Sequence, residues 1–280
     1  MNKEFNKGLS LAGFGSFWWG FFGVIYFKYI SFIGYIELVI HRCLWTTLTL
    51  ILTTFFFSKW DIFFKLTKCK KNLFYLFISG FLIFINWGVW IYAIATNRII
   101  DASFGYFIMP ILSVLLGYIF FNEKLNRKRI FSITLVIVSI LYLIFISIKS
   151  LPWVGLIVAL SWGFYNLVRK KINVDTDIGL LIESLFILPI AIIVFYIIAA
   201  KGYNDFSLSD PSMMLIIFLA GPMTVIPLFL YVRGVELCGL GPTGMIFYIT
   251  PTFQFLLGYF YYNEPFSITK LVSFIFIWIA

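Results

Sequence analysis

The sequence predicts an all-α integral membrane protein with ten transmembrane helices, arranged as two inverted repeats of five helices. Three observations lead to this prediction: an apolar composition, a series of apolar stretches of membrane-spanning length, and a pattern that occurs twice. Of the 280 residues, 62% are hydrophobic and only 12% are charged, and the mean hydropathy is +1.00. Because soluble domains carry about 25% charged residues, this composition excludes an ordinary soluble fold.

The apolar stretches divide the chain into spans. A bilayer core about 30 Å thick requires about 20 apolar residues in a helix. This length predicts spans at about 8–28, 34–57, 73–95, 102–121, 129–148, 152–168, 178–200, 212–233, 241–262 and 267–280. The tenth holds only 14 residues and ends inside an apolar run. We therefore expect an incomplete tenth helix, through truncation or as a short native end.

The repeated pattern lies in the fourth and ninth spans. Residues 102–123 (ASFGYFIMPILSVLLGYIFFNE) and 243–264 (TGMIFYITPTFQFLLGYFYYNE) lie 141 positions apart and share eight identities, among them Pro110/Pro251. A second match pairs Trp19-Gly20-Phe21 with Trp162-Gly163-Phe164. The match predicts two homologous units, residues 1–148 and 149–280. Each unit has an odd number of spans, so the second must cross the membrane in the opposite direction, as in many secondary transporters.

The basic residues predict the orientation. Fifteen Lys and Arg residues fall on the side of the N-terminus and five on the opposite side. Since cytoplasmic loops are enriched in Lys and Arg, both termini are expected in the cytoplasm. The formal net charge of +9 is concentrated in these short gaps between spans. It is therefore interpreted as a topology signal rather than a nucleic-acid-binding patch.

Charged residues inside the second span are candidate functional groups, because charges are costly in a bilayer. Glu37 and His41 are four residues apart on one helix face, and Arg42 is rotated by about 100° from His41. Glu37 and His41 could relay a proton, and Arg42 could hold a substrate carboxylate. The alternative is a self-neutralising cluster near the outer interface. His41 is the only histidine in the sequence, which argues against a histidine-based metal site.

Glu183, in the seventh span, corresponds to Arg42 under the 141-residue offset. If a pseudo-two-fold axis relates the units, these opposite charges are expected to approach each other. They would form a structural ion pair, which is the favoured interpretation, or a gate.

Polar and aromatic residues in other spans predict a central cavity, with interhelical hydrogen bonding and packing as the alternative. Pro110 and Pro251 are expected to act as kinks or hinges. The Asn-Glu pairs 122–123 and 263–264 are expected to cap the helix that follows each. The candidate binding or coupling residues are Glu37, His41, Arg42, Asn86, Trp90, Tyr106, Glu183, Tyr248 and Gln254.

Several segments together carry a family resemblance: IELVIHR (36–42), NWGVWIYA (86–93), ASFGYFIMPILSVLLG (102–117), SWGFYNLVRKKI (161–172), GLLIES (179–184) and YITPTFQFLL (248–257). They resemble the RarD-type EamA transporters of the drug/metabolite transporter superfamily. The resemblance implies a bacterial inner-membrane carrier of ten helices, in which Glu37, His41 and Arg42 match a family motif. RarD proteins are named for chloramphenicol sensitivity or resistance, and superfamily relatives export amino acids and other metabolites. The relatives continue through a full tenth helix into a basic tail, which this sequence lacks.

We therefore expect a secondary active transporter that moves a small organic solute (an amino acid, a metabolite or a drug such as chloramphenicol) by alternating access, as an exporter or exchanger. A passive channel or facilitator and an intramembrane enzyme are the alternatives. The sequence lacks a GxxxxGK[ST] motif, and no cofactor, metal or nucleic acid is expected. Expected partners are the solute, membrane lipids and a coupling ion, with the proton as candidate. A monomer could suffice, and a homodimer is also compatible with the sequence.

Overall fold

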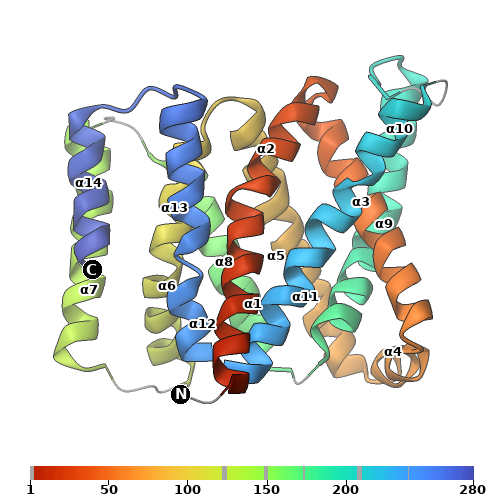
Figure 1. Cartoon of the computed structure of the whole chain (residues 1–280), viewed down its shortest axis with the longest axis horizontal. Helices are drawn as coiled ribbons and strands as arrows, with labels where there is room; N and C mark the ends of the chain where they lie inside the picture. The colour runs from red at the N-terminus through yellow and green to blue at the C-terminus, as the bar shows by residue number, and fades with distance from the viewer. Residues whose placement is uncertain (1–2, 122–124, 148–150, 173, 207–209, 239) are drawn as a thin grey trace.

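The computed structural model describes residues 3–121, 125–147, 151–172, 174–206, 210–238 and 240–280, and within these ranges every regular element is a helix (Figure 1). Seven helical segments of the described chain are long and apolar enough to cross a membrane. The all-α membrane fold is thus confirmed. The sixth, ninth and tenth predicted spans correspond to α8, the interrupted helix α12–α13 and the 12-residue α14, which are not among the seven.

The first half of the chain begins with a continuous helical segment, Lys3–Ile33, and its last long helix ends in a π-helical turn. Its elements are α1 (Lys3–Gly20), α2 (Phe22–Tyr29), η1 (Ile30–Ile33), α3 (Tyr35–Phe56), α4 (Trp60–Thr67), α5 (Lys70–Ala95), α6 (Ile99–Phe121), α7 (Arg127–Tyr142) and η2 (Leu143–Ser147). Gly34, with φ +82°, separates the first segment from α3. Glycine adopts this conformation without steric cost.

The second half has the same order of long helices, with more interruptions. Its elements are α8 (Trp153–Lys170), α9 (Thr176–Ala200), α10 (Pro211–Phe218), α11 (Ala220–Cys238), α12 (Leu240–Ile246), α13 (Ile249–Leu256), η3 (Leu257–Tyr261) and α14 (Ile268–Ile279). Asp210 caps α10 by accepting hydrogen bonds from the backbone N–H groups of Ser212 and Met213. Asp210 is fully exposed, and its hydrogen bonds with Ser212 and Met213 lower its pKa.

The helix contacts obey the symmetry of the repeat. Helix α1 packs on α11 and α13, and its counterpart α8 packs on α5 and α6. Helix α3 packs on α11, and its counterpart α9 packs on α5. Three further pairs, α3 with α9, α6 with α13 and α7 with α14, join each helix to its own counterpart. In Figure 1, α7 and α14 form a separate pair at one edge of the molecule.

The contacts of Glu264 show that the two halves are inverted. They also correct the prediction that Glu264 caps the helix that follows it. Its carboxylate accepts hydrogen bonds from the backbone N–H groups of Ile99 (2.7 Å) and Ile100 (2.8 Å), at the start of α6. The chain leaving α13 therefore lies at the beginning of α6, so these counterpart helices run antiparallel. Glu264 does not cap the following helix, because Ser267 already caps α14 through the N–H of Lys270. Burial raises the pKa of Glu264, and the two amide hydrogen bonds oppose this shift. Residues 122–123 lie outside the described residues.

The contact between α6 and α8 depends on two glycines. A Cβ atom at Gly105 would collide with the backbone carbonyl of Gly155, and one at Gly155 would lie 2.9 Å from the carbonyl oxygen of Asp101. Small residues allow such close approach of membrane helices. This packing positions Tyr106, next to Gly105, in the buried core.

Candidate functional site

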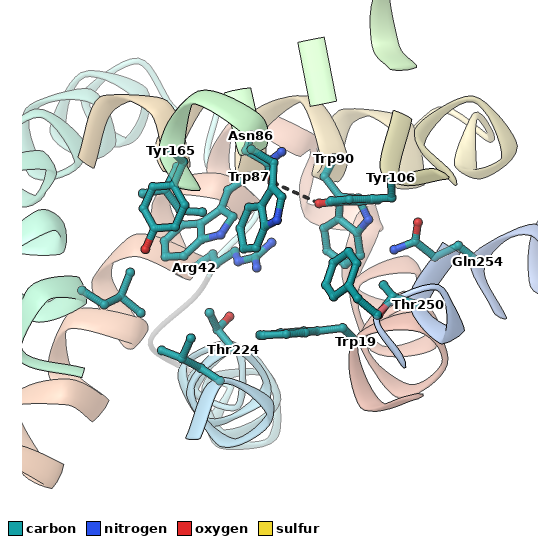
Figure 2. Close-up of a pocket in the computed structure, with 15 residues that line it drawn as sticks. Trp19, Arg42, Asn86, Trp87, Trp90, Tyr106, Tyr165, Thr224, Thr250 and Gln254 are labelled. Atoms are coloured by element: carbon teal, nitrogen blue, oxygen red, sulfur yellow. Dashed lines mark hydrogen bonds between the residues drawn. The ribbon is translucent and has the colours of Figure 1, made fainter. Parts of the chain in front are cut away.

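A pocket lies between the two halves of the chain (Figure 2). It encloses about 600 Å³ of space between atoms, part of which is open to the outside. Fifteen residues line it, and seven of them are aromatic. A mostly apolar pocket with a few polar groups is typical of sites for small organic molecules.

Equivalent positions of the two repeats line the pocket together. Tyr106 and Phe247, Trp87 and Leu228, and Ile83 and Thr224 are each 141 residues apart, and all six residues line it. Trp19 and Trp162, from the shorter repeated motif, also line it. Both repeats therefore contribute residues to the pocket, which lies between them.

Among the described residues that line the pocket, Arg42 is the only charged one. Its side chain projects from α3 between aromatic rings. The guanidinium carbon lies 4.5 Å from the ring centroid of Trp87, 4.9 Å from that of Phe27 and 5.1 Å from that of Trp90. Each such contact contributes about 0.5–2 kcal/mol. No described residue accepts a hydrogen bond from Nε or Nη1 of Arg42, and each buried unpaired donor costs about 1–3 kcal/mol.

Asn86 and Tyr106 form the hydrogen-bonded wall of the pocket. Tyr106 Oη donates to Asn86 Oδ1 at 3.0 Å, the bond drawn in Figure 2. The Asn86 amide nitrogen donates to the carbonyl oxygen of Val158 (3.2 Å) and the hydroxyl of Ser161 (3.1 Å). Asn86 thus ties α5 to α6 and α8, as the interhelical alternative for this residue expects, while Tyr106 turns its ring toward the pocket.

Trp90 and Gln254 also line the pocket, as expected for candidate binding residues. Trp90 Nε1 and Gln254 Oε1 have no hydrogen-bond partner among the described residues. Both atoms are buried, so their hydrogen-bonding capacity is unused within the described chain.

Glu37 and His41 lie outside the pocket. The Glu37 carboxylate accepts hydrogen bonds from the backbone N–H groups of Asp205 (2.8 Å) and Phe206 (3.1 Å). His41 Nε2 lies 3.5 Å from Glu37 Oε1, and the His41 ring contacts the rings of Phe195 and Phe206. Glu37 and His41 do share a face of α3, but that face is turned away from the one that carries Arg42 into the pocket.

Glu183 is fully buried and does not pair with Arg42, which corrects the expected approach of the two charges. It accepts hydrogen bonds from Ser79 Oγ (2.5 Å) and Tyr165 Oη (3.3 Å), and Arg169 Nη1 lies 3.5 Å from its carboxylate. Its partners come from α5 and α8, because Glu183 lies on the face of α9 that packs against these helices. Arg169, counted above only as a topology signal, is an ion-pair partner that the sequence did not reveal.

Three other candidates lie away from the pocket surface. Tyr248 stacks on Phe107, with 6.2 Å between ring centroids. Pro110 lies inside the continuous helix α6, whereas Pro251 follows a break between α12 and α13. Proline has no N–H to donate to the carbonyl of Phe247, which accepts from Thr250 instead at 2.9 Å. The two prolines therefore sit in different backbone settings, although their sequence positions match.

The structure adds pocket residues that were absent from the predicted set. They include Trp19, Thr224, Phe247 and Thr250, whereas Trp87, Trp162 and Tyr165 belong to the aromatic and polar residues of the third and sixth spans from which a cavity was expected. The repeat contained a signal for one of them, because Phe247 is the counterpart of Tyr106. Within the described chain, no three His, Cys, Asp or Glu side chains gather in a way that could hold a metal ion.

Comparison with known proteins gives consistent relatives over the whole chain. The model of the EamA-like transporter family matches twice, at residues 6–145 and 150–280. An uncharacterised transporter, YojE of Bacillus subtilis, is 34% identical over 100% of this chain and 93% of its own length. Protein RarD of Salmonella typhi is 34% identical over 99% of this chain and 94% of its own length. Protein RarD of Escherichia coli is 33% identical over 99% of this chain and 93% of its own length.

Proposed function

Because this chain belongs to the EamA-like transporter family, we propose that it is a secondary active transporter working by alternating access. It moves a small organic solute across the bacterial inner membrane, as an exporter or exchanger. The observation that supports this most is the pocket lined from equivalent positions of two inverted repeats. Inverted repeats can close on either side of such a shared site in turn. We infer a non-enzymatic role, consistent with relatives that are named transporters.

In this proposal Arg42 binds the solute, and the ion pair of Glu183 with Arg169 rearranges during transport. Tyr165 lines the pocket and donates a hydrogen bond to Glu183, so a rearrangement of the Glu183–Arg169 pair would reach the bound solute directly. The coupling ion is a proton. Glu183 is preferred to Glu37 as its carrier, because Glu183 contacts the pocket residue Tyr165, whereas the Glu37 carboxylate accepts hydrogen bonds from the backbone of residues 205–206.

The proposed orientation places both termini in the cytoplasm. In that orientation Lys59, which pairs with Asp177 at 2.6 Å, and Arg169 both lie toward the cytoplasmic end. The excess of Lys and Arg on that side supports this assignment.

The test uses purified protein in liposomes, with uptake of amino acids, nucleosides and chloramphenicol followed with and without a pH gradient. We expect at least one solute to accumulate against its concentration gradient only when the pH gradient is imposed. Glu183→Gln should abolish accumulation, whereas Glu236→Gln should not, since Glu236 lies on an exposed surface beside Arg233. If the unmodified protein and Glu183→Gln both only dissipate a solute gradient, the protein is a channel or facilitator instead.

A further inference from the structure

The chemistry around Arg42 indicates which class of solute the pocket holds. Arg42 is 5% exposed, and Figure 2 shows its guanidinium at the middle of the pocket, beside Trp87 and opposite Trp19. None of the described residues that line the pocket is Asp or Glu. The pocket therefore carries one positive charge that no lining carboxylate balances.

Among the buried lining atoms without a hydrogen-bond partner in the described chain, three are donors and one, Gln254 Oε1, is an acceptor. Nε and Nη1 of Arg42 and Nε1 of Trp90 have no acceptor among the described residues. The Asn86 amide and the Tyr106 hydroxyl are already engaged with each other. A molecule that accepts hydrogen bonds and carries a negative charge therefore complements the pocket best.

The walls of the pocket are aromatic and partly parallel. The rings of Trp162 and Phe247 are inclined by 12° with centroids 6.4 Å apart, and those of Trp162 and Tyr165 are inclined by 29° at 5.3 Å. Flat aromatic faces favour offset stacking with another ring. A planar, apolar body fits this environment better than a sugar or a polar chain.

We propose that the pocket binds an organic monocarboxylate with an aromatic body. The carboxylate accepts charge-assisted hydrogen bonds from the guanidinium of Arg42, and the ring lies among Trp19, Trp162 and Phe247. Amines are excluded by the positive charge of Arg42, and zwitterions are disfavoured because no lining carboxylate receives their ammonium group. This assignment rests on the proposed function, since it names the solute of the same pocket.

Three carboxylates of increasing size, each paired with its neutral amide, test the assignment: benzoate, phenylacetate and 2-naphthoate. Binding to the full-length protein in lipid nanodiscs is measured by calorimetry at millimolar ligand, with phenethylamine and acetate as further comparisons. We expect at least one aromatic carboxylate to bind at least about tenfold more tightly than its amide. Phenethylamine and acetate are expected not to bind.

Variants then assign the charge recognition to Arg42. Arg42→Met should weaken carboxylate binding by about 10- to 100-fold, because a hydrogen bond to a charged group is lost. Arg42→Lys keeps the charge but not the planar fork, and should bind with intermediate affinity. Arg233→Gln, on the exposed surface, should bind as the unmodified protein does. Helix content and monodispersity are measured for each variant, and Arg42→Lys carries the test if Arg42→Met does not fold.

Three results would overturn the assignment: no binding of any of the three carboxylates, equal binding of acid and amide, or undiminished binding to folded Arg42→Met and Arg42→Lys. These results are distinguishable from failure of the transporter proposal. If another solute accumulates in liposomes while the carboxylates do not bind, the transporter stands and only the solute class is wrong. If a carboxylate binds more tightly than its amide, and this binding weakens in the Arg42 variants, but nothing accumulates in liposomes, the assigned site stands and active transport is wrong.

Discussion

Arg42 in α3 and Glu183 in α9 occupy equivalent positions in the two repeats, yet their surroundings differ. Glu183 has a hydroxyl from Ser79, a phenol from Tyr165 and the guanidinium of Arg169 around its carboxylate. Arg42 has aromatic faces around its guanidinium and two nitrogen atoms with no acceptor among the described residues. The duplicated scaffold thus places one buried charge, Glu183, beside an opposite charge and leaves the other, Arg42, without an ion-pair partner among the described residues. This difference is the basis for the roles proposed above, proton coupling for Glu183 and solute binding for Arg42.

Removing the cation of each site, Arg169 beside Glu183 and Arg42 itself, should give the largest difference in stability. Arg169→Met leaves the buried Glu183 carboxylate without its counter-charge and should lower the free energy of unfolding by about 3–5 kcal/mol. Arg42→Met removes a buried cation that pairs with no described carboxylate, so it should leave stability unchanged or raise it. Thermal unfolding in detergent measures both, with Arg233→Met as the exposed control. Equal losses for Arg169→Met and Arg42→Met would erase the distinction between the two sites.

The short hydrogen bond from Ser79 to Glu183 gives the next largest effect. Ser79→Ala should destabilise the protein by about 1.5–3 kcal/mol, because a buried, charge-assisted hydrogen bond is lost. Ser139, also buried, donates to the backbone carbonyl of Ser273 and provides a neutral comparison, for which Ser139→Ala should cost about 1 kcal/mol. A smaller loss at Ser79 than at Ser139 would mean that Glu183 is uncharged in the resting protein.

The aromatic faces around Arg42 sharpen the other half of the comparison. Trp87→Leu makes the first repeat resemble the second, where Leu228 stands at the equivalent position. The loss of the cation–π contact at 4.5 Å should contribute about 0.5–2 kcal/mol to destabilisation. That contribution should vanish when Arg42 is already methionine, as a double-mutant cycle of thermal unfolding would reveal. A purely additive cycle would show that Trp87 supports packing and not the charge.

Tyr165 should show the smallest effect on stability. Its hydroxyl lies 3.3 Å from Glu183, so Tyr165→Phe should cost about 0.5–1.5 kcal/mol. Its effect on transport should be larger than this, because Tyr165 connects the cluster with the pocket. Uptake in liposomes measured beside thermal unfolding separates the two. Tyr26→Phe, which removes a hydroxyl that bonds the carbonyl of Ile216 away from the lining residues, is the matched control.

The sequence predicts the scaffold better than the chemistry of the site. Apolar length and the repeated segment were enough for an all-α membrane protein with inverted halves, because both depend on the bilayer and on the period of the pattern. The same offset paired Arg42 with Glu183, but it could not show that Arg169, 14 residues before Glu183, would take the role of ion-pair partner. Such pairing depends on helix rotation, which hydropathy does not specify.

The sequence also predicts helix ends and breaks poorly. Glu264 lies next to α14 in sequence but binds the start of α6 in space, because Ser267 fills the nearer cap. Pro251 occupies the position equivalent to Pro110 but follows a break between α12 and α13, whereas α6 is continuous. These features arise from tertiary contacts between distant segments, and a single sequence contains no direct record of them.

The central claim is that the pocket between the repeats is open to the two sides of the membrane in turn. The most direct test is a Thr224→Cys variant in a background whose three native cysteines, Cys43, Cys69 and Cys238, are replaced by alanine. A membrane-impermeant maleimide is applied to right-side-out and to inside-out vesicles. The account predicts that the cysteine is labelled from both sides and is protected by a transported solute. Labelling from one side only, under every gradient applied, would contradict it.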